Sequence, residues 1–117
     1  MSKPKLLLHV EGAAVLFVSC VAYHLSHDSW LWFGLLFLTP DVFMLGYLVN
    51  KKLGANAYNL GHTYSALILL LLILWLAGLG SYMWLVLIWL AHIGFDRLLG
   101  YGLKYETAFS DTHLQRV

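Results

Sequence analysis

The chain has 117 residues, of which 61% are hydrophobic and only 11% are charged, and its mean hydropathy is +0.75. This balance differs from that of a soluble globular protein and predicts a single integral-membrane domain over residues 1–117. The net charge of +1 without a basic patch argues against a nucleic-acid-binding protein, and the single cysteine, Cys20, excludes an internal disulfide and a cysteine zinc cluster.

Four apolar stretches predict an all-α protein, a four-transmembrane-helix bundle. A membrane-spanning helix needs about 20 predominantly apolar residues, and we expect such helices over about residues 6–25, 30–49, 57–78 and 82–103. A loop is expected at 50–56 and a polar C-terminal tail at 104–117. In the second stretch, Pro40 is expected to kink the helix directly before Asp41. A signal peptide is disfavoured for the first stretch because Glu11 would lie inside its apolar part.

Basic residues are distributed unevenly between the two sides of this bundle. The opposite loops carry no lysine or arginine, and Asp28 is the only charged residue there. The positive-inside rule therefore predicts that both termini lie in the cytoplasm. The basic residues that would gather on the cytoplasmic side are Lys3, Lys5, Lys51, Lys52, Lys104 and Arg116.

Each predicted span carries polar residues at a similar depth. At about 1.5 Å per residue, Glu11 lies roughly 9 Å from the cytoplasmic end of its span, Asp41 and His62 roughly 13 Å, and Asp96 roughly 12 Å. His92 lies four residues before Asp96, so the two side chains share one face of a helix. Ionisable residues inside a membrane span are costly and are a functional-site hypothesis by default. We therefore expect a shared polar site in the cytoplasmic half of the bundle.

Carboxylates and imidazoles that project inward from facing helices are how helix bundles build metal centres. We expect Asp41, His62, His92 and Asp96 to be the metal ligands, with Asp96 also catalytic and Glu11 as a fifth ligand or general base. Oxygen and nitrogen ligands without thiolate suit zinc, manganese or iron, or magnesium if the histidines do not bind it directly. The residues expected to bind substrate, support the ligands or close the site are Asn59, Arg97, Lys104, Asp111 and His113.

A metal at this depth could activate water, and the nearby basic residues could hold a phosphate or carboxylate head group. The leading prediction is a metal-dependent hydrolase of a lipid-like or amphipathic substrate, and a redox metal centre is the other catalytic option. Three non-catalytic readings stay open: a membrane subunit whose polar layer only holds the helices together, a proton relay, and a pigment or haem carrier. Membrane lipids and a second copy or a larger membrane complex are the expected partners.

Four segments of the chain carry a resemblance to a known family. They are PDVFMLGYL (40–48), YNLGHTY (58–64), AHIGFDRLLGYGLKY (91–105) and FSDTHL (109–114). Together they resemble a group of small bacterial integral-membrane proteins, the domain of unknown function family 4260, over nearly the whole chain from Glu11. The resemblance implies four membrane spans and a bacterial inner membrane, and it implies no catalytic residues. By type only, the chain is also similar to small membrane-bound metal-dependent hydrolases with intramembrane histidine and aspartate.

Overall fold

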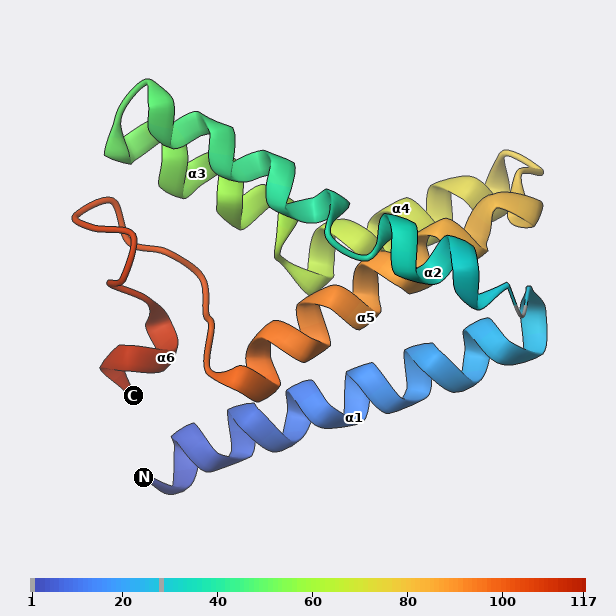
Figure 1. The fold of residues 1–117 in the computed structure, drawn as a ribbon, viewed down its shortest axis with the longest axis horizontal. Helices are drawn as coiled ribbons and strands as arrows, with labels where there is room; N and C mark the ends of the chain where they lie inside the picture. The colour runs from blue at the N-terminus through green and yellow to red at the C-terminus, as the bar shows by residue number, and fades with distance from the viewer. Residues whose placement is uncertain (1, 28) are drawn as a thin grey trace.

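The structure is a computed structural model that describes residues 2–27 and 29–117, so Asp28 lies outside the described residues. Within these residues all regular elements are helices, which confirms the all-α prediction, and one isolated bridge pairs Lys104 with Thr112. In chain order (Figure 1) the elements are α1 (Lys3–Ser26), α2 (Trp30–Leu36), the 3-10 helix η1 (Thr39–Leu48), α3 (Lys51–Gly61), α4 (Tyr64–Leu76), the 3-10 helix η2 (Gly80–Tyr82), α5 (Met83–Leu99) and α6 (His113–Arg116).

Three helical segments are long and apolar enough to cross a membrane: Lys3–Ser26, Trp30–Leu48 and Gly80–Leu99. A fourth is obtained if α3 and α4, which are bent by 49° at the break between them, form one span. Figure 1 shows both termini and the turn between η1 and α3 at one end of the long axis, and the turn between α4 and η2 at the other. The structure thus contains three or four helical segments that could span a membrane, where the sequence predicts four.

The predicted boundaries differ from the structure at three places. The expected loop at 50–56 is mostly the first turns of α3, whose N-terminus is capped by Asn50, because its Oδ1 accepts the Leu53 N–H at 2.7 Å. The third apolar stretch is interrupted after Gly61. The fourth ends at Leu99 rather than 103, since Gly100 adopts a left-handed conformation (φ +100°) that terminates α5.

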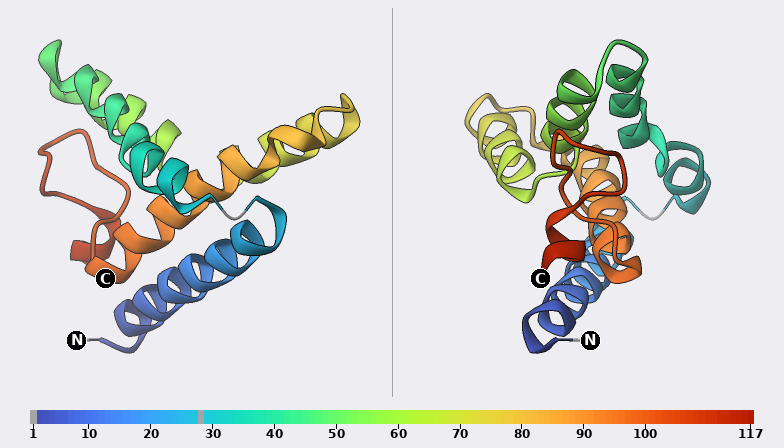
Figure 2. Two further views of the ribbon diagram at one scale, coloured as in Figure 1. Left: turned by 45° about the vertical axis from the view of Figure 1, so that its right-hand side comes forward. Right: turned by 90° about the vertical axis from the view of Figure 1, so that its left-hand side faces the viewer.

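Helices α1 and α5 pack closely through glycines. A Cβ atom on Gly94 would lie 2.7 Å from the backbone nitrogen of Leu16, and one on Gly12 would lie 2.8 Å from the carbonyl oxygen of Gly94. Real Cβ atoms do not approach so closely, so only glycine allows this crossing. Figures 1 and 2 show α1 running alongside α5 for most of its length.

The second closely packed pair is η1 with α3, in which Gly46 faces Gly54. Figure 2 shows this pair leaning away from α1 and α5 and approaching α5 near its middle. The polar residues considered below lie where the two pairs meet.

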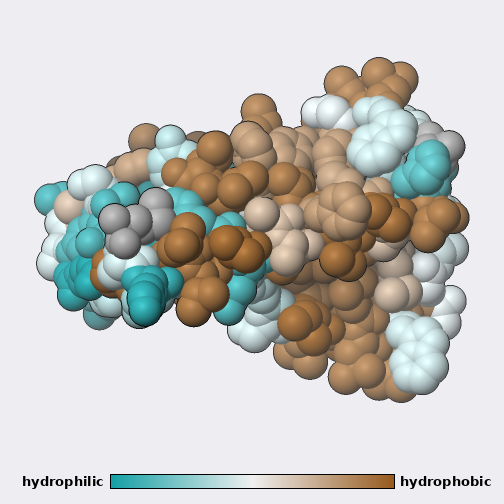
Figure 3. Space-filling view, turned by 90° about the horizontal axis from the view of Figure 1, so that it is seen from below, coloured by the Kyte–Doolittle hydropathy of each residue, from teal (hydrophilic) through white to brown (hydrophobic). Residues whose placement is uncertain are grey.

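The surface of the molecule is largely apolar. Phe17 is 70% exposed and Leu48 is 83% exposed, as expected for side chains that face lipid. Figure 3 shows hydrophilic side chains gathered at one end of the face that it draws, the end that holds the termini. This distribution is the one expected of a membrane protein with one polar end.

Candidate metal centre

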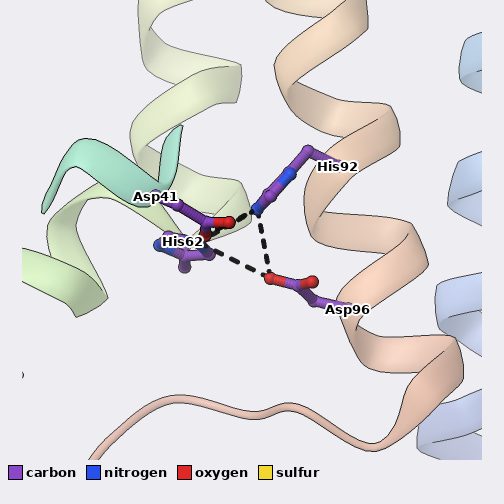
Figure 4. A group of neighbouring side chains, drawn as sticks. All are labelled: Asp41, His62, His92 and Asp96. Atoms are coloured by element: carbon purple, nitrogen blue, oxygen red, sulfur yellow. Dashed lines mark hydrogen bonds and ion pairs between the residues drawn. The ribbon is translucent and has the colours of Figure 1, made fainter. Parts of the chain in front are cut away.

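Four ionisable side chains from three helical elements converge on one point. Asp41 comes from η1, His62 from the break after α3, and His92 and Asp96 from α5 (Figure 4). One ligand atom from each of them lies within 4.8 Å of the other three. The predicted set of four metal ligands is therefore brought together by the fold.

Five of the six separations between these atoms are 3.1–3.5 Å, and the sixth, between the two carboxylate oxygens, is within 4.8 Å. Asp41 Oδ1 lies 3.2 Å from His62 Nε2 and 3.1 Å from His92 Nε2. Asp96 Oδ2 lies 3.5 Å and 3.2 Å from the same two nitrogens, which are 3.2 Å apart. Around an ion with bonds of about 2.1 Å, neighbouring ligand atoms lie roughly 3.4 Å apart in a tetrahedron and roughly 3.0 Å apart in an octahedron. The residues present therefore fit a small divalent metal ion.

The hydrogen bond of His62 Nδ1 determines which nitrogen of this imidazole carries the proton. His62 Nδ1 lies 2.9 Å from the carbonyl oxygen of Tyr58, so Nδ1 carries the proton and donates it. In the neutral imidazole Nε2 then has a lone pair, which faces two carboxylate oxygens. Such a set of lone pairs repels unless a proton or a metal ion lies between them. A backbone carbonyl behind a histidine is also the usual way in which a metal-binding imidazole is oriented.

Breaks in two helices place Asp41 and His62. Pro40 cannot donate a backbone hydrogen bond, and the Thr39 hydroxyl instead satisfies the Leu36 carbonyl at 2.7 Å. This break between α2 and η1 points Asp41 toward α5 (Figure 4). An aspartate at the break can thus leave the lipid-facing surface.

The break between α3 and α4 leaves backbone carbonyls that must find donors in an apolar environment. The indole Nε1 of Trp89 donates to the Gly61 carbonyl at 2.6 Å, and the Arg97 guanidinium donates to the His62 carbonyl at 2.8 Å. Both donors belong to α5, so the same helix that supplies His92 and Asp96 also fixes the break that carries His62. The Tyr58 ring stacks on the His62 ring, with centroids 3.8 Å apart.

The centre is buried on its histidine side and open on its aspartate side. The side chains of His62 and His92 are 0% and 2% exposed, whereas those of Asp41 and Asp96 are 37% and 13% exposed. His92 Nδ1 is buried near the Phe37 carbonyl, with which it makes no well-aligned hydrogen bond. A cavity of about 250 Å³ adjoins the two aspartates. It is lined by Asp41, Met44, Tyr58, Asp96, Tyr101, Lys104 and Phe109.

Lys104 is fixed beside this cavity by Asn59. The Asn59 amide donates to the Lys104 carbonyl at 2.8 Å and accepts the Lys104 N–H at 2.6 Å. The Lys104 Nζ lies 4.7 Å from the Tyr58 ring centroid and 3.6 Å from that of Phe109. Burial lowers the pKa of Lys104, and the charges of Asp96 and Asp41 act in the opposite direction. The structure thus brings two of the predicted supporting residues, Asn59 and Lys104, to the centre.

The structure places the other predicted residues away from the four ligand atoms. Glu11 and Arg97 line a separate cavity of about 440 Å³, which His113 also lines. Arg97 is bound to two backbone carbonyls, those of His62 and Tyr101. This geometry does not place Glu11 as a ligand or base, and it gives Arg97 a hydrogen-bonding role at the helix break.

The tail residues Asp111 and His113 stabilise the tail itself. Asp111 pairs with Arg116, with an Nη2–Oδ2 distance of 2.6 Å, and accepts a hydrogen bond from the Thr107 hydroxyl. These contacts hold the pKa of Asp111 at about 2. His113 Nδ1 accepts the Leu103 N–H at 2.8 Å, and burial, followed by the Arg97 charge, lowers its pKa.

Sequence reasoning did not single out Tyr58, Trp89 and Phe109 as parts of this centre. Tyr58 lies four residues before His62, so their stacking on α3 could have been inferred from helical spacing. The contact of Trp89 depends on where the third span breaks, and that of Phe109 on how the tail folds back. Neither feature has a signal in the hydrophobic pattern.

Comparison with known proteins identifies the family of the chain. Residues 5–117 match the profile of the family described as Domain of unknown function (DUF4260). No curated protein and no solved structure matches the chain significantly. Since the match spans nearly the whole sequence, including every residue of the centre, the chain belongs to the DUF4260 family.

Proposed function

We propose that this protein is a membrane-embedded, metal-dependent hydrolase that acts on an amphipathic substrate. Asp41, His62, His92 and Asp96 would hold one divalent ion, with zinc, manganese and iron all compatible with two imidazoles and two carboxylates. The observation that carries the proposal is the convergence of four ligand atoms inside largely apolar helices, with five of their six separations at 3.1–3.5 Å.

The residues of the centre divide the chemistry between them. A bound divalent ion would lower the pKa of a water molecule and polarise the bond to be hydrolysed. The two histidines are buried and would hold the ion from that side. Asp41 Oδ1 and Asp96 Oδ2 face the centre, so each carboxylate has a second oxygen that is available to the cavity. Asp96 would accept a proton from the water through its second carboxylate oxygen.

The size of the cavity limits which part of a substrate can enter it. About 250 Å³ accommodates a head group but not a long acyl chain, which would have to stay in the surrounding lipid. The polar end of the molecule carries the basic residues of both termini and of the start of α3. Following the positive-inside rule, we propose that this end lies in the cytoplasm, that the protein is a multi-pass protein of a bacterial inner membrane, and that its cavity opens to the inner leaflet.

Hydrolysis is tested with purified protein in lipid nanodiscs. The substrates are nitrophenyl esters and nitrophenyl phosphodiesters that carry alkyl chains, each offered to chelator-treated protein before and after metal is restored. The proposal expects turnover that disappears with the chelator and returns with zinc, manganese or iron. His92→Ala should show no turnover in either state. Turnover that is equal in wild type and His92→Ala would refute the assignment.

A non-catalytic role is the second candidate, because separations of 3.1–3.2 Å are also hydrogen-bond lengths. In that case the four groups would join the two helix pairs through protons. His92 could donate from Nε2 as a neutral imidazole, whereas His62, whose Nδ1 donates to Tyr58, would need a second proton on Nε2 to donate to a carboxylate. Polar contacts of this kind stabilise membrane bundles by about 0.6 kcal/mol on average. This candidate predicts folded protein without stoichiometric metal.

A further inference from the structure

Lys104 is a buried cation that makes no ion pair with the described part of the chain. The residue is only 6% exposed, yet no carboxylate of residues 2–27 or 29–117 lies within 4 Å of its Nζ. Its nearest neighbours are the faces of Tyr58 and Phe109. Aromatic rings attract a cation but do not neutralise it. Asp41 and Asp96 line the same cavity, but the proposed divalent ion would take up their charge. A buried charge without a counter-ion is costly, so with that ion bound the arrangement favours an anion that comes from outside the chain.

Backbone contacts on both sides of Lys104 fix the position of its ammonium group. Asn59 holds both backbone polar groups of Lys104, and the bridge to Thr112 holds the next part of the tail. These contacts restrict the side chain to the wall of the cavity that also carries Asp41 and Asp96. The exposed lysines at the start of α3, Lys51 and Lys52, have no comparable contacts.

The charge of the cavity favours one anionic group. A divalent ion between Asp41 and Asp96 would be neutralised by the two carboxylates, because both histidines are then neutral ligands. Lys104 would leave a single positive charge in a partly enclosed, apolar environment. An oxyanion held by both the lysine and the ion would offset this charge.

We propose that Lys104 binds a phosphate group of the substrate, so that the substrate class is the phosphate esters of amphipathic molecules. This inference rests on the proposed metal centre. A metal ion and a lysine are a recurring pair around a transferred or hydrolysed phosphoryl group, since both oppose its oxygen charges. The Tyr58 and Phe109 rings would contact the apolar part of the same molecule.

The test measures binding rather than turnover. Metal content and equilibrium binding of radiolabelled inorganic phosphate are determined for zinc-loaded protein in nanodiscs of phosphatidylcholine. A second arm uses nanodiscs that contain phosphatidic acid and measures the lipid retained by the protein on exchange into phosphatidylcholine. The variants are Lys104→Met, Lys104→Arg and the matched control Lys52→Met, whose lysine is exposed.

Lys104→Met is expected to weaken phosphate binding about tenfold to a hundredfold, whereas Lys104→Arg and Lys52→Met stay within a few-fold of wild type. Binding in the first arm identifies free phosphate as a ligand, and lysine-dependent retention in the second identifies a lipid head group. If metal-loaded wild type and metal-loaded Lys104→Met bind phosphate and retain lipid equally, the inference about Lys104 is refuted, and the proposed metal centre is not affected. Protein that holds no metal overturns both.

Discussion

Replacing Arg97 with methionine tests whether this residue supports the metal centre or contacts substrate. In the structure Arg97 is 5% exposed and donates to the carbonyls of His62 and Tyr101, at 2.8 and 3.0 Å. Tyr101 is half exposed, so water can replace the second bond. The His62 carbonyl is buried, and leaving it without a donor costs about 1–3 kcal/mol. We therefore expect Arg97→Met to lower the free energy of unfolding by about that amount.

The same substitution should weaken metal binding. The Arg97 bond holds the backbone of His62 at the helix break, and loss of groups that orient a metal ligand reduces affinity by about 10- to 100-fold. Unfolding is followed by tryptophan fluorescence in mixed micelles, using the five tryptophans of the chain. Metal affinity is measured by competition with a chelating dye.

Arg116→Met is the matched control for Arg97→Met. Arg116 is an exposed arginine paired with Asp111, and exposed ion pairs contribute little to stability. Equal unfolding free energies and equal metal affinities for the two variants would refute the role assigned to Arg97. Unchanged stability with weaker substrate binding would instead support the substrate contact predicted from the sequence.

Three further predictions concern packing and the tail. Gly94→Val should destabilise the protein by about 1–3 kcal/mol because it forces α1 and α5 apart. The control Gly34→Val should not, because a Cβ atom there meets nothing within 4 Å. Equal melting temperatures for the two variants would contradict the close crossing of α1 and α5. Burial lowers the pKa of His113, so its stabilising contribution is full above pH 6.5 and falls on acidification. The protection of the tail amides, meaning their exchange rate relative to the intrinsic rate at the same pH, should then fall between neutral pH and about pH 5. Unchanged protection would count against this role of His113. Asn59→Ala removes two hydrogen bonds to Lys104, each contributing about 1 kcal/mol, so the tail amides should exchange roughly thirtyfold faster.

The depth of polar residues along the spans is the part of the centre that could be predicted from the sequence. Counting residues from the polar ends puts Asp41, His62 and Asp96 at one level, and the structure brings their side chains together. The count carries no information on rotation about the helix axis. Glu11 is therefore at a suitable depth but faces another cavity, together with Arg97.

Of the two helix breaks, the first could be predicted from the sequence and the second could not. Pro40 marks the first break, since proline lacks the backbone donor that a continuous helix needs. The second, after Gly61, has no proline, and its carbonyls are satisfied by side chains of α5 that are distant in sequence. The sequence analysis predicts a loop where α3 starts, because the residues there are polar. Asn50, a good helix cap, is the signal for the start of this helix. The end of α5 at Gly100 has a recognisable signal, a glycine after the last apolar turn.

The central claim is that the four converging side chains hold a metal ion, and elemental analysis of purified protein tests it most directly. Wild type is compared with His92→Ala and Asp41→Asn, and with two controls outside the centre, His27→Ala and Asp111→Asn. His27 stacks on Trp84, and Asp111 pairs with Arg116. We predict about one divalent ion per chain in wild type and both controls, and loss of that ion in His92→Ala and Asp41→Asn. Folded wild-type protein without stoichiometric metal would contradict the account.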